Sequence, residues 1–234
     1  MEIVPAHPIT SLTFIGSSFL VPLLVFGTYR SSGASTQKSL GIAAAVTLWG
    51  IIMFFFMRYW QFSFESPLAI WGIVIINLIW PSVLVIVFRE FFVGDGLSLK
   101  WLALIQATRF MGGLFILENI RGFTGTTFAY TGGFGDVIAA VIALTILLQL
   151  LTGGHPNKFI YYFLIAFGVA DFFLAYTLSF LSSDGIPLQS LALDEAHLMN
   201  LYPLALIPHF LVPFAMAYHW LMYFTVKRAA TRPA

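Results

Sequence analysis

The chain has 234 residues, of which 59% are hydrophobic and 9% are charged, and its mean hydropathy is +0.91. Soluble domains carry about a quarter charged residues, so this composition excludes a water-soluble particle, a disordered chain and a coiled coil. The net charge of +1 leaves no basic field for nucleic acid, and the absence of cysteine excludes disulfides, iron–sulfur clusters and cysteine-ligated zinc. The composition therefore predicts a polytopic membrane protein.

Seven apolar runs are candidates for membrane-spanning helices, each of which needs about 20 residues. The runs are continuous, without the alternating pattern of a membrane β-barrel, and this favours helices. The predicted fold is all-α: a polytopic transmembrane helix bundle that forms one membrane domain over residues 1–234. The seven predicted spans are 9–29, 39–57, 68–88, 97–117, 136–151, 159–181 and 202–226.

Basic residues set the predicted orientation, because cytoplasmic loops are enriched in Lys and Arg. They gather on one side of the predicted bundle, whereas Arg58 and Arg121 fall on the other. We therefore expect the N-terminus outside and the C-terminus inside. The residues of the basic side are Arg30, Lys38, Arg89, Lys100, Lys158, Lys227, Arg228 and Arg232.

Two connections are long enough to carry structure of their own, residues 119–135 and 182–201. The first includes GFTGTTFAYTGGFG and is predicted to be a glycine-rich loop packed against the mouth of the bundle. Asp136 follows it and is interpreted as a cap of the fifth span, because the exposed amides at a helix start favour a carboxylate. The second connection is predicted to be a solvated connector, with a short interfacial helix as the alternative.

Small residues recur at every fourth position in two spans. Gly41 is followed by Ala45, and Gly135 is followed by Ala139 and Ala143. Small side chains allow helix backbones to approach closely in a membrane. We expect both faces to pack against neighbouring helices.

Ionisable side chains within a span are costly and rarely face lipid, so each is a candidate for function. At about 1.5 Å per residue, Arg109 lies about 13 Å into the fourth span and Asp171 about 20 Å into the sixth. We predict that these two residues form an ion pair, because an unpaired arginine at this depth would be expensive. Gln106 and Asn77 lie at comparable depth and are expected to support the pair by hydrogen bonds. A purely structural role, as a link between helices, is the alternative.

The last span contains two histidines and three prolines. His209 lies about 10 Å into it and is the expected third member of the polar cluster, since imidazole titrates near neutral pH. His219 lies about 15 Å further along the helix, so the two histidines cannot share one metal ion. Pro203, Pro208 and Pro213 are expected to bend or unwind the span, as in helices that line transporter cavities, with a simple kink as the alternative.

Familiar enzyme and cofactor motifs are missing from the sequence. It has no HExxH, no GxSxG and no pair of aspartates at one depth, so enzymatic activity stays uncertain, with a noncatalytic role favoured. The histidine positions argue against a di-haem cytochrome b, while a single haem with His and Met ligands stays open. The last span has no Schiff-base lysine for retinal before Lys227. No metal site is expected, and the identity of any cofactor is unknown.

Five features are found in residues 101–229: Gln106 three residues before Arg109, a glycine-rich segment that ends in Asp136, the acidic Asp171, the stretch IPHFLVP, and His219 ahead of a basic tail. With them the chain resembles a family of small, uncharacterised bacterial polytopic integral membrane proteins. The resemblance implies a multi-pass location in the cytoplasmic (inner) membrane and no particular activity. It also implies that the five named residues are functional positions, with His219 in place of His209.

Two functions of different classes fit these observations. In the first, transporter- or sensor-like, a central polar cluster binds a small solute or relays protons, with Arg109 as anion anchor, Asp171 as counter-ion and a histidine as titrating group. In the second, the chain is a noncatalytic subunit of a larger membrane complex of respiratory or photosynthetic type, and the cluster only links helices. A lipid-directed enzyme lacks an identifiable nucleophile. Expected partners are the lipid bilayer and either other membrane subunits or further copies of the chain.

Overall fold

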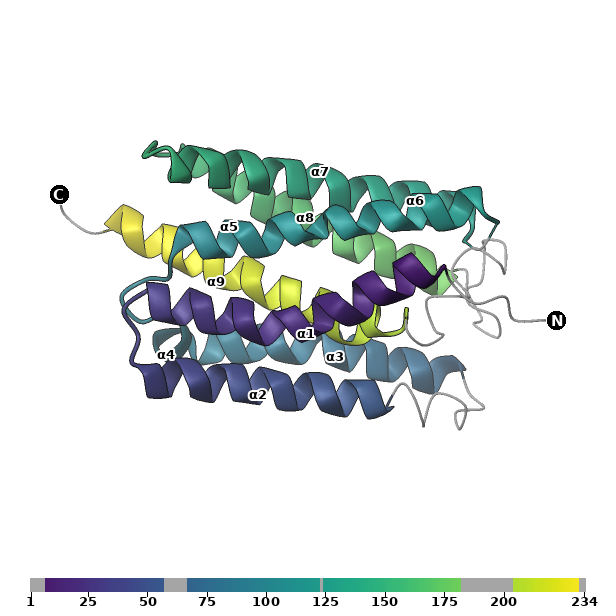
Figure 1. Ribbon diagram of the computed structural model, residues 1–234, viewed down its shortest axis with the longest axis horizontal. Coiled ribbons are helices and arrows are strands. Elements are labelled where there is room, and N and C mark those ends of the chain that lie inside the picture. Colours follow the sequence, from purple (N-terminus) through teal and green to yellow (C-terminus); the bar gives the residue numbers. More distant parts are fainter. Residues whose placement is uncertain (1–6, 57–66, 123, 182–203, 232–234) are drawn as a thin grey trace.

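The computed structural model describes residues 7–56, 67–122, 124–181 and 204–231. Within these ranges every regular element is helical and none is a strand. The helices run back and forth along one long axis and form an elongated bundle (Figure 1). Its longer helices are α1 (Pro8–Ser31), α2 (Thr36–Phe55), α3 (Pro67–Val87), α7 (Thr126–Leu151), α8 (Lys158–Leu181) and α9 (Val212–Thr231).

Four helices, α1, α2, α7 and α8, are long and apolar enough to cross a membrane. The segment Val74–Val87 of α3 is a shorter apolar helix. Many large apolar side chains lie on the outer surface, including Phe19, Ile120 and Phe159, which are 70%, 72% and 72% exposed. An apolar surface of this extent is suited to contact with lipid. The predicted all-α fold is confirmed, and the architecture is compatible with a membrane protein.

Local sequence signals set where the first two helices begin and end. His7 precedes α1 and accepts a hydrogen bond from the backbone N–H of Ile9 at 3.1 Å, and Pro8 occupies the first helical position, where its missing N–H costs nothing. Ser35 caps α2 by accepting from the N–H of Lys38 at 3.2 Å. Gly33 lies between these helices at φ 82°, a conformation that glycine adopts without strain.

The predicted fourth span is divided into three elements. They are α5 (Leu99–Ala107), the 3₁₀ turn η3 (Thr108–Gly112) and α6 (Gly113–Ile120). The three follow one another along a single rod (Figure 1). A 3₁₀ stretch has three residues per turn, so the rod changes pitch at its middle. The short helix α4 (Arg89–Val93), which precedes this rod, was not predicted.

The last rod begins with a π-helical turn, η5 (Ile207–Leu211), ahead of α9. The N–H of Val212 donates to the carbonyl of Ile207, five residues back. The next residue, Pro213, has no N–H, so the carbonyl of Pro208 accepts from the hydroxyl of Tyr176 on α8 at 2.5 Å. The distortion expected from the prolines is present at this turn, whereas Pro203 lies outside the described residues.

The predicted glycine-rich loop is wrong over residues 126–135, because α7 begins at Thr126, ten residues before the predicted start of the fifth span. Gly and Thr have low helix propensity, which explains the error. Close packing compensates for it: a Cβ atom at Gly133 would lie 3.0 Å from the carbonyl oxygen of Gly112. Asp136 is therefore in the middle of a helix, and its interpretation as a cap is wrong as well. The other long connection, 182–201, lies outside the described residues.

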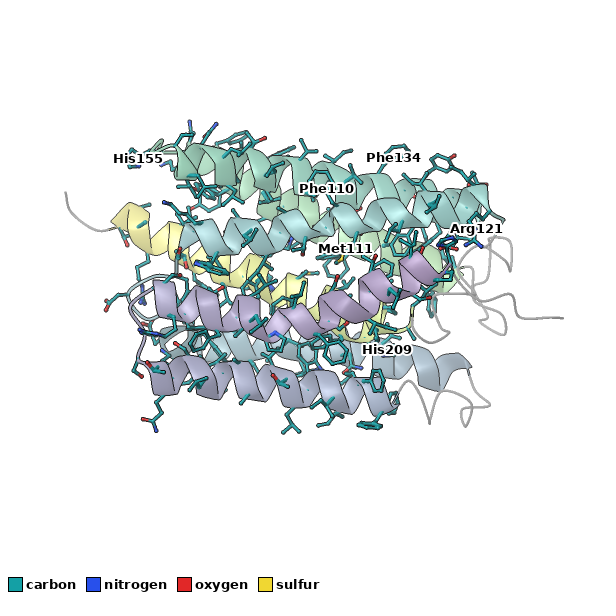
Figure 2. All side chains as sticks on the ribbon, viewed as in Figure 1. Phe110, Met111, Arg121, Phe134, His155 and His209 are labelled. Carbon is teal, nitrogen blue, oxygen red and sulfur yellow. The ribbon has the colours of Figure 1, made fainter. Side chains whose placement is uncertain are left out.

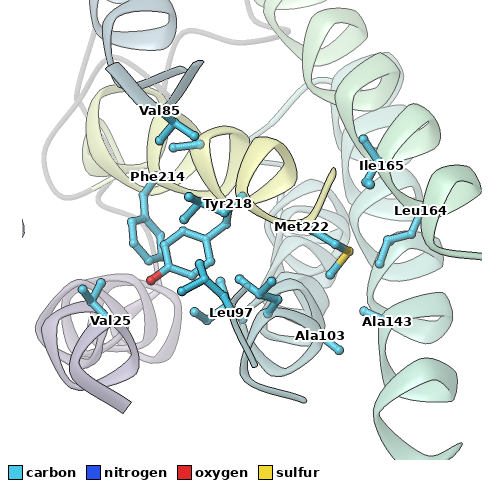
Figure 3. Packing of buried hydrophobic residues seen from close by; sticks show 14 of the residues in the cluster. Val25, Val85, Leu97, Ala103, Ala143, Leu164, Ile165, Phe214, Tyr218 and Met222 are labelled. Atoms are coloured by element: carbon cyan, nitrogen blue, oxygen red, sulfur yellow. The ribbon is translucent and has the colours of Figure 1, made fainter. Parts of the chain in front are cut away.

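The main core lies where α5, α7, α8 and α9 meet, with Val25 of α1 and Val85 of α3 packed into it, and Figure 3 shows part of this core. Ala139 and Ala143 of α7 are fully buried, so this small-residue face packs closely, as predicted. The expectation fails on α2. Gly41 and Ala45 are exposed, and nothing lies within 4 Å of the position that a Cβ atom at Gly41 would take.

Most basic side chains lie at one end of the bundle, which we call the basic end; in Figure 1 it is the end with the C-terminus. Hydrogen bonds join separate segments there; for example, the N–H of Ser98 donates to the hydroxyl of Ser32 at 2.7 Å, and Arg228 donates to Glu90 at 2.5 Å. The described basic residues of this end are Arg30, Lys38, Arg89, Lys100, Lys158, Lys227 and Arg228.

Candidate functional site: a charged cluster inside the bundle

Arg109, on η3, is 5% exposed, and its guanidinium contacts ionisable side chains from three helices. Its Nε donates to Oδ1 of Asp136 on α7 at 2.7 Å, and its Nη2 donates to Oδ2 of Asp171 on α8. Its Nη1 lies 3.4 Å from Nε2 of His219 on α9. We call Arg109, Asp136, Asp171 and His219 the charged cluster.

The ring of Phe172 covers one face of the Arg109 guanidinium. The Cζ atom of Arg109 lies 4.0 Å from the centre of the Phe172 ring, a cation–π arrangement. The same ring meets the imidazole of His219 edge to face, with 5.9 Å between centroids. The arginine is thus fixed by two carboxylates in its plane and by an aromatic ring above it.

Three glycines make room for the charged groups. A Cβ atom at Gly112 would overlap Asp136, one at Gly135 would overlap Asp171, and one at Gly168 would overlap both His219 and Arg109. In each case the atoms would come closer than 3.0 Å. Larger residues are excluded there, since the helices are packed directly onto the cluster. The neighbouring Phe110 and Phe134 point away from the bundle (Figure 2).

The charges of the cluster do not cancel when both aspartates are ionised. One arginine and two carboxylates sum to −1 (+1 − 2), with His219 neutral. An uncompensated charge away from water is expensive, both in protein interiors and in membranes. One additional proton makes the whole cluster neutral.

Two cavities reach the cluster. The larger, of about 310 Å³, has Arg109 and Asp136 in its wall and extends between α1, η5 and α9. The smaller, of about 50 Å³, has both Asp136 and Asp171 in its wall, beside Tyr176 and Pro208. Asp136 therefore borders both cavities, and Asp171 borders one.

Two buried polar atoms near the cluster have no hydrogen-bond partner. They are Nδ1 of His219 and Oε1 of Gln106, and both side chains are 0% exposed. An unsatisfied buried group costs about 1–3 kcal/mol. These atoms give the region spare capacity to donate or accept a hydrogen bond.

The structure brings together some of the predicted residues and separates others. Arg109 and Asp171 are in contact, and Asp136, which was interpreted as a cap, is the second carboxylate. The supporting role predicted for Gln106 and Asn77 is wrong. Gln106 donates to the carbonyl of Ala215 at 3.2 Å, because its amide faces α9.

His209 lies outside the charged cluster. The position beside Arg109 that was expected for His209 is occupied by His219. His209 is 3% exposed on η5, and its Nδ1 lies 3.3 Å from the amide nitrogen of Asn77 on α3. The same amide donates to the sulfur of Met53 at 3.5 Å. These contacts link α2, α3 and η5, and they explain why Asn77 does not reach Arg109.

Sequence reasoning missed Phe172, Gly112 and Gly168. It identified Gly135 in the series of small residues with Ala139 and Ala143, but not that this glycine makes room for Asp171. Among the residues that the structure describes, no group of three or more His, Asp or Glu side chains is arranged to hold a metal ion.

Another buried carboxylate, separate from the charged cluster, lies near the end of the bundle opposite the basic end. Glu118 on α6 is 0% exposed and accepts from the hydroxyl of Thr10. It also accepts from the backbone N–H of His7 at 3.2 Å and from Arg121 at 3.2 Å. These contacts attach the start of α1 to α6.

Fold and site define an all-helical protein that has four helices long and apolar enough to cross a membrane and a buried charged cluster at its centre. Residues 68–226 match the family described as Domain of unknown function (DUF8737), and the chain belongs to this family. The matched segment contains the whole charged cluster and excludes α1 and α2. The expected relation to an uncharacterised family is confirmed. No curated protein and no solved structure matches the chain.

Proposed function

We propose that the chain is a multi-pass membrane protein whose charged cluster binds a proton and relays it between the two cavities beside it. One observation carries this proposal: the buried Asp171 and the partly buried Asp136 share one arginine, and Asp136 borders both cavities. Uptake of one proton removes the net negative charge of the cluster, and its release to the other side restores it. A cavity that reaches the cluster favours this function over a purely structural one.

The contacts of Arg109 favour a proton over an anionic solute as the species bound. Its Nε, Nη1 and Nη2 already face Asp136, His219 and Asp171. An anion at the guanidinium would have to displace one of these side chains and its charge-assisted hydrogen bond. The anion-anchor role predicted for Arg109 is thus less well supported than the relay.

The geometry assigns His219 a definite protonation form. Guanidinium nitrogens only donate, so Nε2 of His219 accepts from Nη1 of Arg109, and the ring proton is carried by Nδ1. Nδ1 has no partner in the structure. Nδ1–H of the neutral imidazole is therefore free to donate a hydrogen bond beside the cluster, while the aspartates take up and release the proton; His209 has no contact with Arg109 or either aspartate.

For the topology we propose seven crossings of the cytoplasmic (inner) membrane, with the N-terminus outside and the basic end inside. The proposed spans are α1, α2, α3, the rod of α5 to α6, α7, α8, and η5 with α9. The basic end supports this orientation by the positive-inside rule. Because the sequence contains no cysteine, Lys100→Cys and Ile120→Cys each create a unique labelling site. An impermeant thiol reagent applied from outside should label Ile120→Cys and not Lys100→Cys; the reverse pattern would overturn the orientation.

Proton flux into liposomes that contain the purified protein tests the relay. With a potassium diffusion potential and an internal pH dye, we expect the unaltered protein to conduct and Asp136→Asn and Asp171→Asn to lose most of the flux. Glu90→Gln is the matched control, because Glu90 is an exposed acid at the basic end. We expect His219→Gln to impair the flux and His209→Gln to preserve it. Flux equal to that of empty liposomes for the unaltered protein would overturn the relay.

Infrared titration gives a readout that does not depend on flux. The carbonyl stretch of a protonated buried carboxylic acid should appear and disappear with pH in the unaltered protein. We expect Asp136→Asn or Asp171→Asn to remove this band and Glu90→Gln to retain it. A band that persists in both asparagine variants would show that the cluster does not bind the proton.

The second candidate function, a noncatalytic subunit of a larger membrane complex, is favoured by the three glycines that pack helices onto the charged groups. Such packing also suits a link between helices. The native mass and absorption spectrum of the protein, purified from its own membrane in mild detergent, separate the two functions. A colourless monomer supports the relay, whereas a coloured or heavier species supports the subunit.

A further inference from the structure

A groove that the relay does not use lies on the other side of the bundle, between α2 and α3. The helix α2 packs along α1, and α3 packs along α9, but α2 and α3 have few direct contacts. They meet through the rings of Trp49 and Trp80, whose centroids are 5.0 Å apart, and through Met53 and Asn77. From Trp49 towards the basic end, a cavity of about 600 Å³ opens between the two helices.

This cavity has the dimensions and the lining of a ligand site. Its volume falls within the range of about 300–1,000 Å³ that such sites have. Its wall on α2 includes Gly41 and Ala45, the small-residue face that was expected to meet a helix and meets none. The opposite wall is apolar and includes Trp80 and Phe214.

Polar groups gather at the basic end of the groove. Lys38 lies in its wall, together with the exposed Ser35 and Gln37. The ammonium group of Lys38 donates to the backbone carbonyl of Phe91 and lies 4.7 Å from the centre of the Phe91 ring. A lysine has three N–H donors, so two remain for an anion at the mouth of the groove.

A buried hydroxyl lies deeper in the groove. Tyr218 on α9 is 4% exposed, lines the cavity, and its hydroxyl has no well-formed hydrogen bond. It lies beside Thr28, whose own hydroxyl donates to the carbonyl of Leu24 at 2.7 Å. Thr28 is three residues from the end of α1, so Tyr218 is about one helical turn in from the basic end. It is available to donate to an acceptor in the groove.

We propose that this groove binds one anionic phospholipid. Its phosphate meets Lys38, an ester carbonyl accepts from the buried hydroxyl of Tyr218, and an acyl chain follows Gly41 and Ala45 towards Trp49. Trp49 is eleven residues beyond Lys38 on α2, or about 16 Å along the helix. The order of charged, hydrogen-bonding and apolar groups along the groove matches the order of groups along a phospholipid. The lipid site depends on a membrane location and is independent of the proton relay.

Native mass spectrometry of the detergent-purified protein tests the proposal, with dioleoyl phosphatidylglycerol and dioleoyl phosphatidylcholine as probes at equal concentration. We expect one phosphatidylglycerol to be retained in preference to phosphatidylcholine. Lys38→Gln should lower its affinity about fivefold, the factor that one lysine contributes near an anionic lipid. Lys158→Gln is the matched control, because Lys158 begins α8 at the same end and does not line the groove. Asp171→Asn should retain the lipid, so failure of the relay and failure of this site are distinguishable.

Three further variants test the proposed position of the lipid and its acyl chain in the groove. Ala45→Phe places a ring in the groove at an exposed position and should abolish the preference, and Tyr218→Phe should weaken it. Phosphatidylglycerol with brominated acyl chains should quench tryptophan fluorescence in the unaltered protein and less in Trp49→Phe. Equal retention of both lipids, or retention unchanged in both Lys38→Gln and Ala45→Phe, would overturn the site and leave only surrounding bilayer lipid.

Discussion

The bundle buries carboxylates in two regions, and the regions differ in how the negative charge is balanced. Near one end there is a single carboxylate, Glu118, and it accepts from three donors: a hydroxyl, a backbone N–H and an arginine that is 33% exposed. At the centre, Asp136 and Asp171 share Arg109. One site has a surplus of donors for its single charge, and the other has one cation for two charges.

This difference is why we assign Glu118 to the attachment of two helices and propose proton exchange for the central site. A carboxylate that receives several hydrogen bonds holds two segments together, as Glu118 does for α1 and α6. At the central site two carboxylates share one cation, two buried polar atoms nearby have no hydrogen-bond partner, and cavities border the cluster. Only the central site is therefore suited to exchange a proton.

The largest expected effect is that of Arg109→Ala, which leaves two buried carboxylates without a cation. We expect a loss of about 3–5 kcal/mol in the free energy of unfolding, measured by denaturant titration in detergent. The double variant Arg109→Ala/Asp171→Ala should recover only part of this loss, because Asp136 stays uncompensated. The triple variant that also carries Asp136→Ala should recover more of it. Arg121→Ala, at the partly exposed Glu118 pair, should cost less. Strictly additive losses would show that the three side chains do not interact.

The next effect concerns the fit of the helices around the charges. Gly135→Ala drives a methyl group into the carboxylate of Asp171, and we expect a loss of about 1–3 kcal/mol from overpacking. Gly16→Ala is the control, since nothing lies within 4 Å of its Cβ position, and it should stabilise α1 by about 0.5–1 kcal/mol. Thermal unfolding of both variants decides the point; equal shifts would contradict the packing described here.

A smaller effect is expected at the end of the bundle. Thr10→Val removes the hydroxyl that donates to Glu118 and should cost about 1.5 kcal/mol, the lower end for a hydrogen bond to a charged group, because two other donors remain. Proton flux through liposomes should not change. A parallel loss of stability and flux would mean that the two acidic regions are coupled.

The smallest effect belongs to Glu90, the exposed acid at the basic end. The hydrogen bond from Arg228 lowers the pKa of Glu90 below its usual 4.5. A lowered pKa in the folded state means that the contribution to stability is present above pH 4.5 and is lost as the pH falls through the folded value. Glu90→Gln should thus lower the midpoint of thermal unfolding slightly at pH 7 and leave it unchanged well below pH 4.5. A difference that persists in acid would exclude this pair as its source.

The sequence predicted the contact of Arg109 with Asp171 for a sound physical reason: few carboxylates lie at membrane depth, so an arginine there has few partners. It did not predict the second partner. Asp136 was assigned to a helix end because ten residues rich in Gly and Thr precede it, and propensity favours a loop there. Tertiary packing overrides propensity in α7, and this information is carried by Gly112 and Asp171 in other elements.

The histidines show a similar limit. Depth along a straight helix placed His209 near the charges, but η5 begins the last rod with a π-helical turn, which changes the faces that follow. His219, three turns further on, reaches Arg109 instead. The likeness of motifs identified His219, whereas a calculation on an ideal helix did not.

The 3₁₀ turn that carries Arg109 has a mechanical consequence. Five residues at about 120° each complete about 600° of rotation, whereas the same residues in α-helical form would complete about 500°. Conversion of η3 to α-helix would therefore swivel α6 by about 100° relative to α5 and shorten the rod by about 2.5 Å. Arg109 lies on this joint while Asp136 and Asp171 belong to other helices, so a change of pitch would pull the cation away from at least one of its anions.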